Sequence, residues 1–118
     1  MAKTRARSGK AAAPTRRAKT AGRSAARPPL HGVRVIDLTR VLAGPFCAML
    51  LGDMGADVIK IEEPKEGDDA RAWAPFVGSW SAYFLGVNRS KRSVALDLKC
   101  PDGAANLRAL LAQADVFI

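Results

Sequence analysis

Basic residues at three places in the chain are spaced so that they could hold one anionic ligand. Arg40 follows a short apolar run, Lys91 and Arg92 precede a later one, and Lys99 stands at the end of that later run. If both runs are parallel strands, Arg40 and Lys99 lie at the carboxyl edge of one sheet and can converge on an anion. Backbone N–H groups of a helix beginning near Pro45 would add positive charge there. The pattern indicates a phosphate-rich ligand, although a solvated charge is the commoner role for any one of these residues alone.

The carboxylates give weaker signals for catalysis. Asp37, Glu62 and Asp97 each end an apolar run, where a general base could lie. No histidine or second carboxylate stands at an informative spacing from any of them, since the single histidine, His31, precedes the first run. We therefore expect capping or ion-pairing roles for the three carboxylates, and we predict no catalytic residue within this chain.

The two cysteines and the Gly44-Pro45 turn exclude several common sites. Cys47 and Cys100 have neither metal-ligand spacing nor the density of a disulfide scaffold, so we expect reduced, packed thiols and no metal site. A nucleophilic role for Cys47, near a helix start, is the less favoured alternative. The turn at Gly44-Pro45 lacks the glycine spacing of a dinucleotide fingerprint or a phosphate-binding loop.

Parallel strands and helices must bring the basic residues together. Apolar, mostly β-branched runs predict strands over residues 33–37, 57–61, 93–98 and 115–118. Helices are predicted from Pro45 to Gly55, from Ser79 to Leu85 with Ser79 as the cap, and onward from Pro101. Residues 62–78 are predicted to form a long exposed loop. This order of elements predicts an α/β fold built on a Rossmann-like parallel sheet.

The first 29 residues differ in composition from the rest. Nine basic and no acidic residues precede Leu30, which leaves ten basic and eleven acidic residues for positions 30–118. A segment with so little to bury cannot offset the entropy of ordering, so we predict a disordered basic tail over 1–29. Such a tail could hold nucleic acid or an anionic membrane, or serve as a mitochondrial transit peptide. A solvated extension is the favoured interpretation.

Two further features concern the chain as a whole. No apolar run approaches the ~18 to 20 residues that a membrane-spanning helix needs, so we expect a soluble, cytoplasmic protein, with the mitochondrion as the alternative location. The chain stops inside the apolar run 115–118, whereas a parallel strand ordinarily continues into a loop at its carboxyl end. This predicts that residues 30–118 are a truncated part of a larger domain.

Four sequence blocks stand in a characteristic order and spacing. They are IDLTRVLAGP at 36–45, LLGDMGADVIKIEEP at 50–64, GDDARAW at 67–73 and NRSKRSVALDLKCPDG at 88–103. Over residues 30–118 the chain resembles the class III CoA-transferase family, which includes formyl-CoA transferase, L-carnitine CoA-transferase and the α-methylacyl-CoA racemases. The resemblance implies a Rossmann-like sheet, a longer polypeptide and a homodimer of interlocked rings. It also implies acyl-CoA and a carboxylic acid as partners, with coenzyme A as a substrate and no separate cofactor.

The resemblance also implies a binding site for CoA along this edge of the sheet. The residues that it carries over are Arg40, Val41, Leu42, Ala43, Leu96 and Lys99, with Lys91 and Arg92 shaping the pocket. Leu96 is expected beside the adenine and Lys99 on a phosphate. The family's nucleophilic aspartate falls after Ile118. The chain is thus interpreted as the amino-terminal fragment of an acyl-CoA:carboxylate CoA-transferase that contributes CoA-binding residues.

The resemblance leaves alternatives open. A racemase of the same superfamily is the runner-up, although GDDARAW looks more like the transferases. A non-catalytic remnant, or a nucleic-acid-binding arm governed by the basic tail, is the alternative from a different class. Formyl-CoA transferase has histidine where Arg40 stands and glutamine where Leu42 stands, and the latter change argues against oxalate. It also has a basic residue in place of Glu63, so one phosphate contact must be absent or supplied by another residue.

Overall fold

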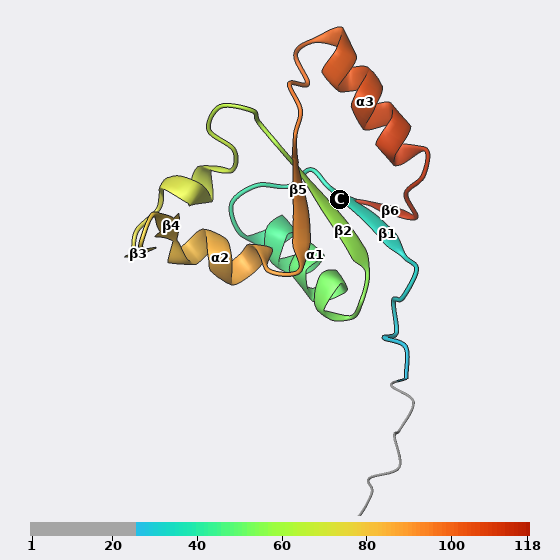
Figure 1. Cartoon of the computed structure of the whole chain (residues 1–118), viewed down its shortest axis with the longest axis horizontal. Coiled ribbons are helices and arrows are strands. Elements are labelled where there is room, and N and C mark those ends of the chain that lie inside the picture. Colours follow the sequence, from blue (N-terminus) through green and yellow to red (C-terminus); the bar gives the residue numbers. More distant parts are fainter. Residues whose placement is uncertain (1–25) are drawn as a thin grey trace, which may run out of the picture.

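Four parallel strands form the centre of the protein in the computed structural model, which describes residues 26–118 (Figure 1). The sheet has the order β5-β2-β1-β6, so that its third, second, first and fourth strands along the chain lie side by side. A doubly wound sheet begins in this order. The strands are β1 (Arg34–Asp37), β2 (Asp57–Glu62), β5 (Lys91–Ala95) and β6 (Val116–Phe117). The predicted α/β fold with a parallel sheet is confirmed.

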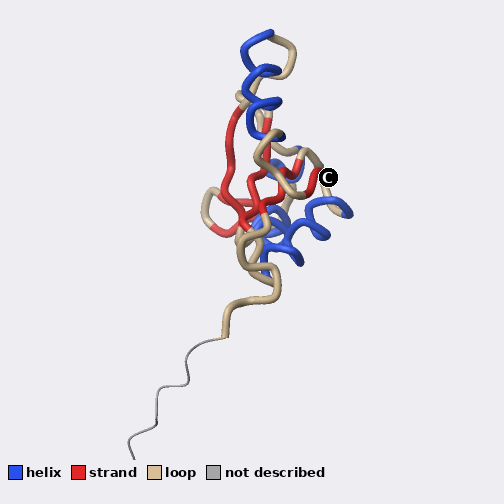
Figure 2. The backbone as a smooth tube through the Cα atoms, turned by 90° about the vertical axis from the view of Figure 1, so that its right-hand side faces the viewer, coloured by secondary structure: helices blue, strands red, loops and turns tan. Residues whose placement is uncertain are grey.

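Helices α1 (Ala43–Asp53) and α3 (Pro101–Leu111) cover opposite faces of this sheet. Side chains alternate along a strand, so Val35 and Val58 point to one face and pack with Ala48 of α1. On the other face Ile36, Ile59 and Ile61 pack with the leucines of α3. Figure 2 shows α3 at the top, extending beyond the strands, with the other helices below it. The two buried faces explain why β1 and β2 carry apolar residues that point to both sides of the sheet.

Local signals fix the ends of both helices. α1 ends where Gly55 takes a φ of 98°, a left-handed conformation that favours glycine. α3 starts with Pro101, which needs no hydrogen-bond partner in the first turn, and its leucines recur at helical spacing, as predicted. The strand predicted over 93–98 instead spans Lys91–Ala95, so Lys99 lies in the loop that precedes α3.

The segment between β2 and β5 is more ordered than predicted. In place of a long loop it forms a 3-10 turn, η1 (Asp69–Ala72), and a short antiparallel hairpin of β3 (Phe76–Val77) and β4 (Trp80–Ser81). Helix α2 (Ala82–Asn88) follows and packs against α1. The predicted cap at Ser79 is wrong, because the Ser81 hydroxyl accepts the hydrogen bond from the Phe84 amide at 3.2 Å. In Figure 1 this segment projects to the left of the sheet.

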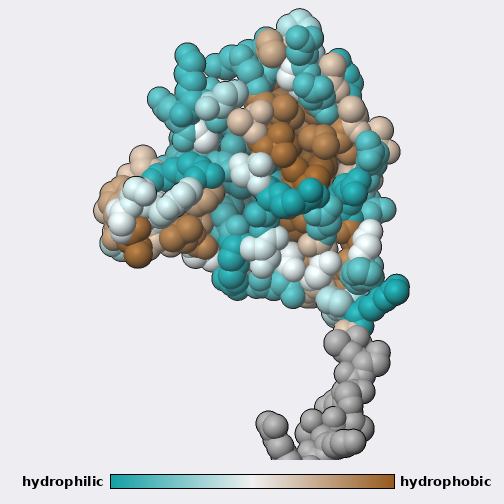
Figure 3. Space-filling model, in the orientation of Figure 1, coloured by the Kyte–Doolittle hydropathy of each residue, from teal (hydrophilic) through white to brown (hydrophobic). Residues whose placement is uncertain are grey.

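Apolar side chains remain at the surface in several places. Figure 3 shows one group between α3 and the sheet and another over the β3–β4 hairpin. A third group follows the outer side of α1 at intervals of four residues, with Leu42, Phe46, Leu50 and Met54 each between 42% and 47% exposed. No helix within residues 26–118 is long and apolar enough to cross a membrane. The predicted tail lies, apart from its last few residues, outside the described part of the chain.

Candidate functional site

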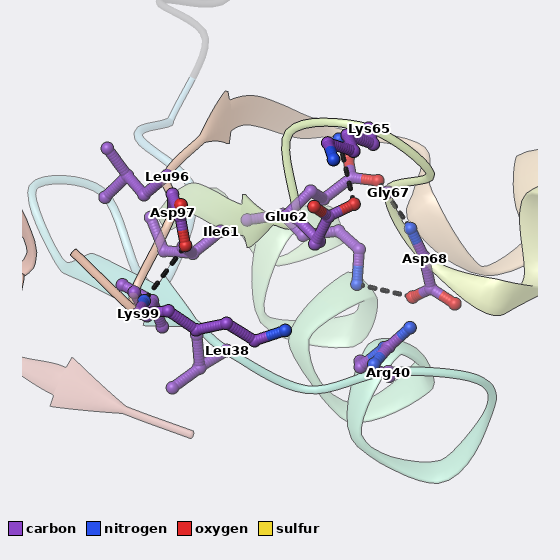
Figure 4. Close-up of a pocket in the computed structure, with 13 residues that line it drawn as sticks. Leu38, Arg40, Ile61, Glu62, Lys65, Gly67, Asp68, Leu96, Asp97 and Lys99 are labelled. Atoms are coloured by element: carbon purple, nitrogen blue, oxygen red, sulfur yellow. Dashed lines mark hydrogen bonds and ion pairs between the residues drawn. The ribbon is translucent and has the colours of Figure 1, made fainter. Parts of the chain in front are cut away.

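A cavity of about 420 Å³ opens at the carboxyl ends of β1, β2 and β5 (Figure 4). This is the sheet edge where ligands bind in open parallel sheets. Leu38, Ile61, Leu96 and Leu98 give it an apolar wall, and four basic and four acidic side chains surround that wall. The charged residues are Arg40, Lys60, Lys65, Lys99, Glu62, Glu63, Asp68 and Asp97. An apolar wall beside several cations suits a ligand that combines a flat ring with phosphate groups.

The Arg40 and Lys99 cations are accessible to such a ligand. The Arg40 guanidinium contacts the Asp69 carboxylate at 2.7 Å, and both side chains are about half exposed. An ion pair so open to water contributes little, so an incoming anion can replace it. The Lys99 ammonium takes part in no ion pair with any of residues 26–118. The Asp97 carboxylate accepts a hydrogen bond from the Lys99 amide at 3.0 Å and so shapes the loop that carries this lysine.

The turn that presents Arg40 is tied to a buried ion pair. The Lys60 ammonium lies 2.8 Å from the Asp68 carboxylate, and both side chains are almost fully buried. Lys60 also donates a hydrogen bond to the Thr39 carbonyl at 2.7 Å. Asp68 accepts one from the Val41 amide at 3.1 Å. Burial raises the pKa of Asp68, but the hydrogen bonds from Lys60 and from backbone amides outweigh it and hold the pKa below its usual value.

Two further ion pairs involve charged residues of the strands. The Asp37 carboxylate lies 2.9 Å from the Lys91 ammonium, and Glu62 contacts Arg71 at 2.7 Å. Burial raises the pKa of Glu62, but hydrogen bonds from Arg71 and Ser93 outweigh burial and hold the pKa below its usual value. The Glu62 carboxylate therefore stays ionised. For Lys91, burial is the larger effect and lowers the pKa despite the nearby Asp37. The ion-pairing roles predicted for Asp37 and Glu62 are confirmed.

The structure brings together three of the predicted CoA-binding residues, Arg40, Leu96 and Lys99. Val41, Leu42 and Ala43 lie beside the cavity, in the turn and the first residue of α1, and are not among its lining residues. Their direct part in binding stays a prediction.

Lys91 and Arg92 do not reach the cavity, contrary to expectation. Both belong to the start of β5, at the opposite edge of the sheet from the cavity. Lys91 is buried and its ammonium is engaged by Asp37, by the Asn88 side chain and by the Pro45 carbonyl. Arg92 is exposed and binds Asp57 at 2.6 Å. Neither cation is placed to meet a ligand at the cavity.

Sequence reasoning missed the contributions of Lys60, Lys65 and Asp68. Lys60 interrupts the apolar strand β2, and a charge inside a buried strand signals a partner elsewhere in the chain. That partner could not be named because Asp68 stands in a segment without periodicity. Nothing in the local sequence marks Lys65, yet the loop after β2 returns it to the cavity. Among residues 26–118 no cluster of acidic, histidine or cysteine side chains could hold a metal ion.

Comparison with known proteins identifies the family of the chain. The family model for CoA-transferase family III matches residues 30–118 of the chain. The chain belongs to this family. Within CoA-transferase family III it is 56% identical over 91 residues to human succinyl-CoA:glutarate CoA-transferase, covering 76% of this chain and 21% of the human protein. A succinate–glutarate CoA-transferase from Agrobacterium fabrum is 54% identical over 99 residues, with 78% of this chain and 25% of that protein covered.

Solved structures of related proteins share the fold. A CAIB/BAIF family protein from Brucella suis has a TM-score of 0.72 and 45% identity, covering 78% of this chain and 25% of that chain. A hypothetical protein from Mycobacterium tuberculosis has a TM-score of 0.69 and 40% identity, covering 76% and 24%. The chain therefore spans about a fifth to a quarter of the length of the relatives that it matches.

Proposed function

We propose that this chain provides the CoA-binding part of an acyl-CoA:carboxylate CoA-transferase. The observation that carries the proposal is the convergence of Arg40, Lys99 and the apolar wall at Leu96 on one cavity of suitable chemistry. The adenine would lie against the leucines, and the phosphates would meet the two cations. Lys65 adds a third cation at the rim, which offers a substitute for the basic residue that Glu63 replaces.

The identities of the relatives favour a particular pair of substrates. Two proteins named for succinate and glutarate, from a mammal and a bacterium, share more than half of their aligned residues with this chain. We therefore infer succinyl-CoA as the acyl donor and a glutarate-like dicarboxylic acid as the acceptor. All relatives reported above that carry an activity in their name are transferases, which favours CoA transfer over racemisation.

The reacting carboxylate of the proposed transferase belongs, in this proposal, to sequence outside residues 26–118. Glu62 and Asp68 are buried in ion pairs at the cavity, and the pKa of each is lowered. A carboxylate so stabilised is a poor nucleophile. The proposal includes a homodimer, and the exposed apolar side of α1 supports it, because such a surface is ordinarily covered in a complete protein.

Calorimetric titration of the chain with CoA tests the binding proposal. We expect saturable binding that is competed by inorganic pyrophosphate, together with no turnover of succinyl-CoA and glutarate by the chain alone. Absence of CoA binding by a folded chain would reject the proposed function. Turnover by a clean preparation would instead show that the reacting carboxylate is within the chain.

A further inference from the structure

We infer that Asp68 positions Arg40 for its ligand by fixing the backbone of the turn from which Arg40 reaches the cavity. This inference rests on the proposed CoA site. Asp68 itself lines the cavity only with a buried side chain, and its role is to act through Arg40.

The Asp68 carboxylate is fully used by groups of the protein. The Val41 amide donates to it at 3.1 and 3.3 Å, to one oxygen and the other. The Ala70 amide donates at 3.0 Å and so closes the first turn of η1. The Lys60 ammonium lies at 2.8 Å. With no capacity left for a ligand, the carboxylate is built to hold the chain around it.

The turn needs such a tether because of the conformation of Val41. Its φ is 71°, a left-handed value that is unfavourable for a β-branched residue. Backbone strain of this kind persists only when surrounding contacts impose it. The hydrogen bond from the Val41 amide to Asp68 is the contact that holds this residue. Without it, Val41 would relax to a negative φ and the direction of the Arg40 side chain would change.

The residue on the other side of Arg40 is held by the same ion pair. The Thr39 carbonyl accepts a hydrogen bond from Lys60 at 2.7 Å, so Lys60 and Asp68 together fasten the backbone before and after Arg40. The guanidinium tip is free by comparison, since its contact to Asp69 is exposed. An arginine anchored at its backbone and accessible at its tip loses little entropy when it binds a phosphate.

The test compares Asp68→Ala with Asp68→Asn, which keeps an acceptor oxygen for the Val41 amide. We expect Asp68→Ala to accelerate amide hydrogen exchange at Val41 and to weaken CoA binding about tenfold. Asp68→Asn should lose less CoA affinity than Asp68→Ala. Adding Asp68→Ala to an Arg40→Ala variant should change CoA affinity little, because the residue that Asp68 positions is already absent. An equal loss in both backgrounds would show a general structural role and overturn the inference.

Removing Asp68 leaves the buried Lys60 without its partner, and the variant could unfold for that reason. Lys60→Met is therefore compared with Lys60→Met/Asp68→Ala, in which neither charge of this ion pair remains. The matched control is Asp53→Asn, whose carboxylate pairs with Arg89 at the far end of α1 and should leave CoA affinity unchanged.

CoA affinity and hydrogen exchange at Val41 together separate this inference from the proposed function on which it rests. If the unaltered chain does not bind CoA, the proposed function fails, while exchange at Val41 still reports whether Asp68 holds the turn. If CoA binds and Asp68→Ala changes neither its affinity nor exchange at Val41, the inference fails and the proposed function stands.

Discussion

Arg40 and Lys99 differ from the buried charged residues at the cavity in how they are engaged. Lys60, Glu62 and Asp68 are buried in ion pairs that the fold requires, whereas Arg40 has only an exposed partner. Lys99 has no ion pair within the described residues and projects from a loop shaped by Asp97. These two residues should therefore affect binding far more than stability.

Replacing either residue with alanine should weaken CoA binding about tenfold or more. A hydrogen bond to a charged group contributes about 1.5 to 3 kcal/mol, and Arg40→Ala or Lys99→Ala removes one from a phosphate. Calorimetry with CoA and with dephospho-CoA measures the loss and identifies the phosphate concerned. Arg92→Ala, which removes an equally exposed cation at the opposite edge, is the control and should bind normally. Unchanged affinity in both cavity variants would contradict the predicted site.

Acid should destabilise the chain through the buried carboxylates. The pKa of Glu62 lies below its ordinary 4.5 and that of Asp68 below its ordinary 3.8, so the folded state binds fewer protons than the unfolded state in this range. Their contribution to stability is therefore complete above about pH 5 and is lost as the pH falls through the folded pKa values. Urea unfolding from about pH 6 to about pH 3 measures it. Glu62→Gln should reduce the change of the unfolding free energy with pH. If that change is unaltered in the variant, Glu62 is not one of the carboxylates responsible for it.

At the scale of elements, the loop before α3 is fixed by a close contact with the helix. Gly103 lies in the first turn of α3, and a Cβ atom placed there would collide with the Asp97 carbonyl. The Cys100 side chain accepts a hydrogen bond from the Gly103 amide at 3.3 Å, which caps the helix. The loop that presents Lys99 is thus held between the end of β5 and the start of α3.

Gly103→Ala should lower both stability and CoA affinity, because the added methyl group must displace the loop from Asp97 to Cys100. Overpacking of this kind costs about 1 to 3 kcal/mol. Gly86→Ala in α2 is the matched control, since no atom lies within 4 Å of its added methyl group. That control should gain about 0.5 to 1 kcal/mol from the better helix propensity of alanine. Thermal unfolding and CoA titration of both variants would expose an error in either expectation.

Elements with strong local signals were predictable from the sequence. Strands β1 and β2 appear within one or two residues of their predicted bounds, and helix α3 begins at Pro101 as predicted, because β-branched runs and leucine periodicity determine them. The β3–β4 hairpin was missed because strands of two residues carry no period. The role of Lys91 depends on Asp37, 54 residues away in the sequence, and no local pattern encodes that contact. Arg40 and Lys99 were found because strand ends of a parallel sheet share one edge, whereas Leu96 came from the family resemblance alone.

At the scale of the whole molecule, several large apolar side chains lie exposed outside the core. Apolar side chains contact water over the hairpin and between α3 and the sheet (Figure 3), and also along the outer side of α1. Contiguous patches of this kind promote association between molecules. Strand β6 adds an edge with unpaired backbone groups, because among residues 26–118 it pairs only with β1.

The isolated chain should consequently associate with itself as its concentration rises. Phe46→Lys together with Leu50→Lys should reduce this association and leave the unfolding midpoint nearly unchanged, since both side chains are over 40% exposed. Light scattering against concentration measures the effect. Asn106→Lys, which adds a charge on the exposed side of α3, should not reduce association. If the α1 variant associates like the unaltered chain, a different surface is responsible.

The position of β1 in the sheet has a consequence for synthesis on the ribosome. One edge of β1 is covered by β2 soon after it emerges, but the other edge waits for β6, and the Arg34 and Asp115 that meet at this junction are 81 residues apart. At elongation rates of about 5 to 20 residues per second, that edge stays open for roughly 4 to 16 s. The nascent chain therefore presents an unpaired central strand to chaperones and to neighbouring nascent chains on the same message, and slower translation would lengthen this interval.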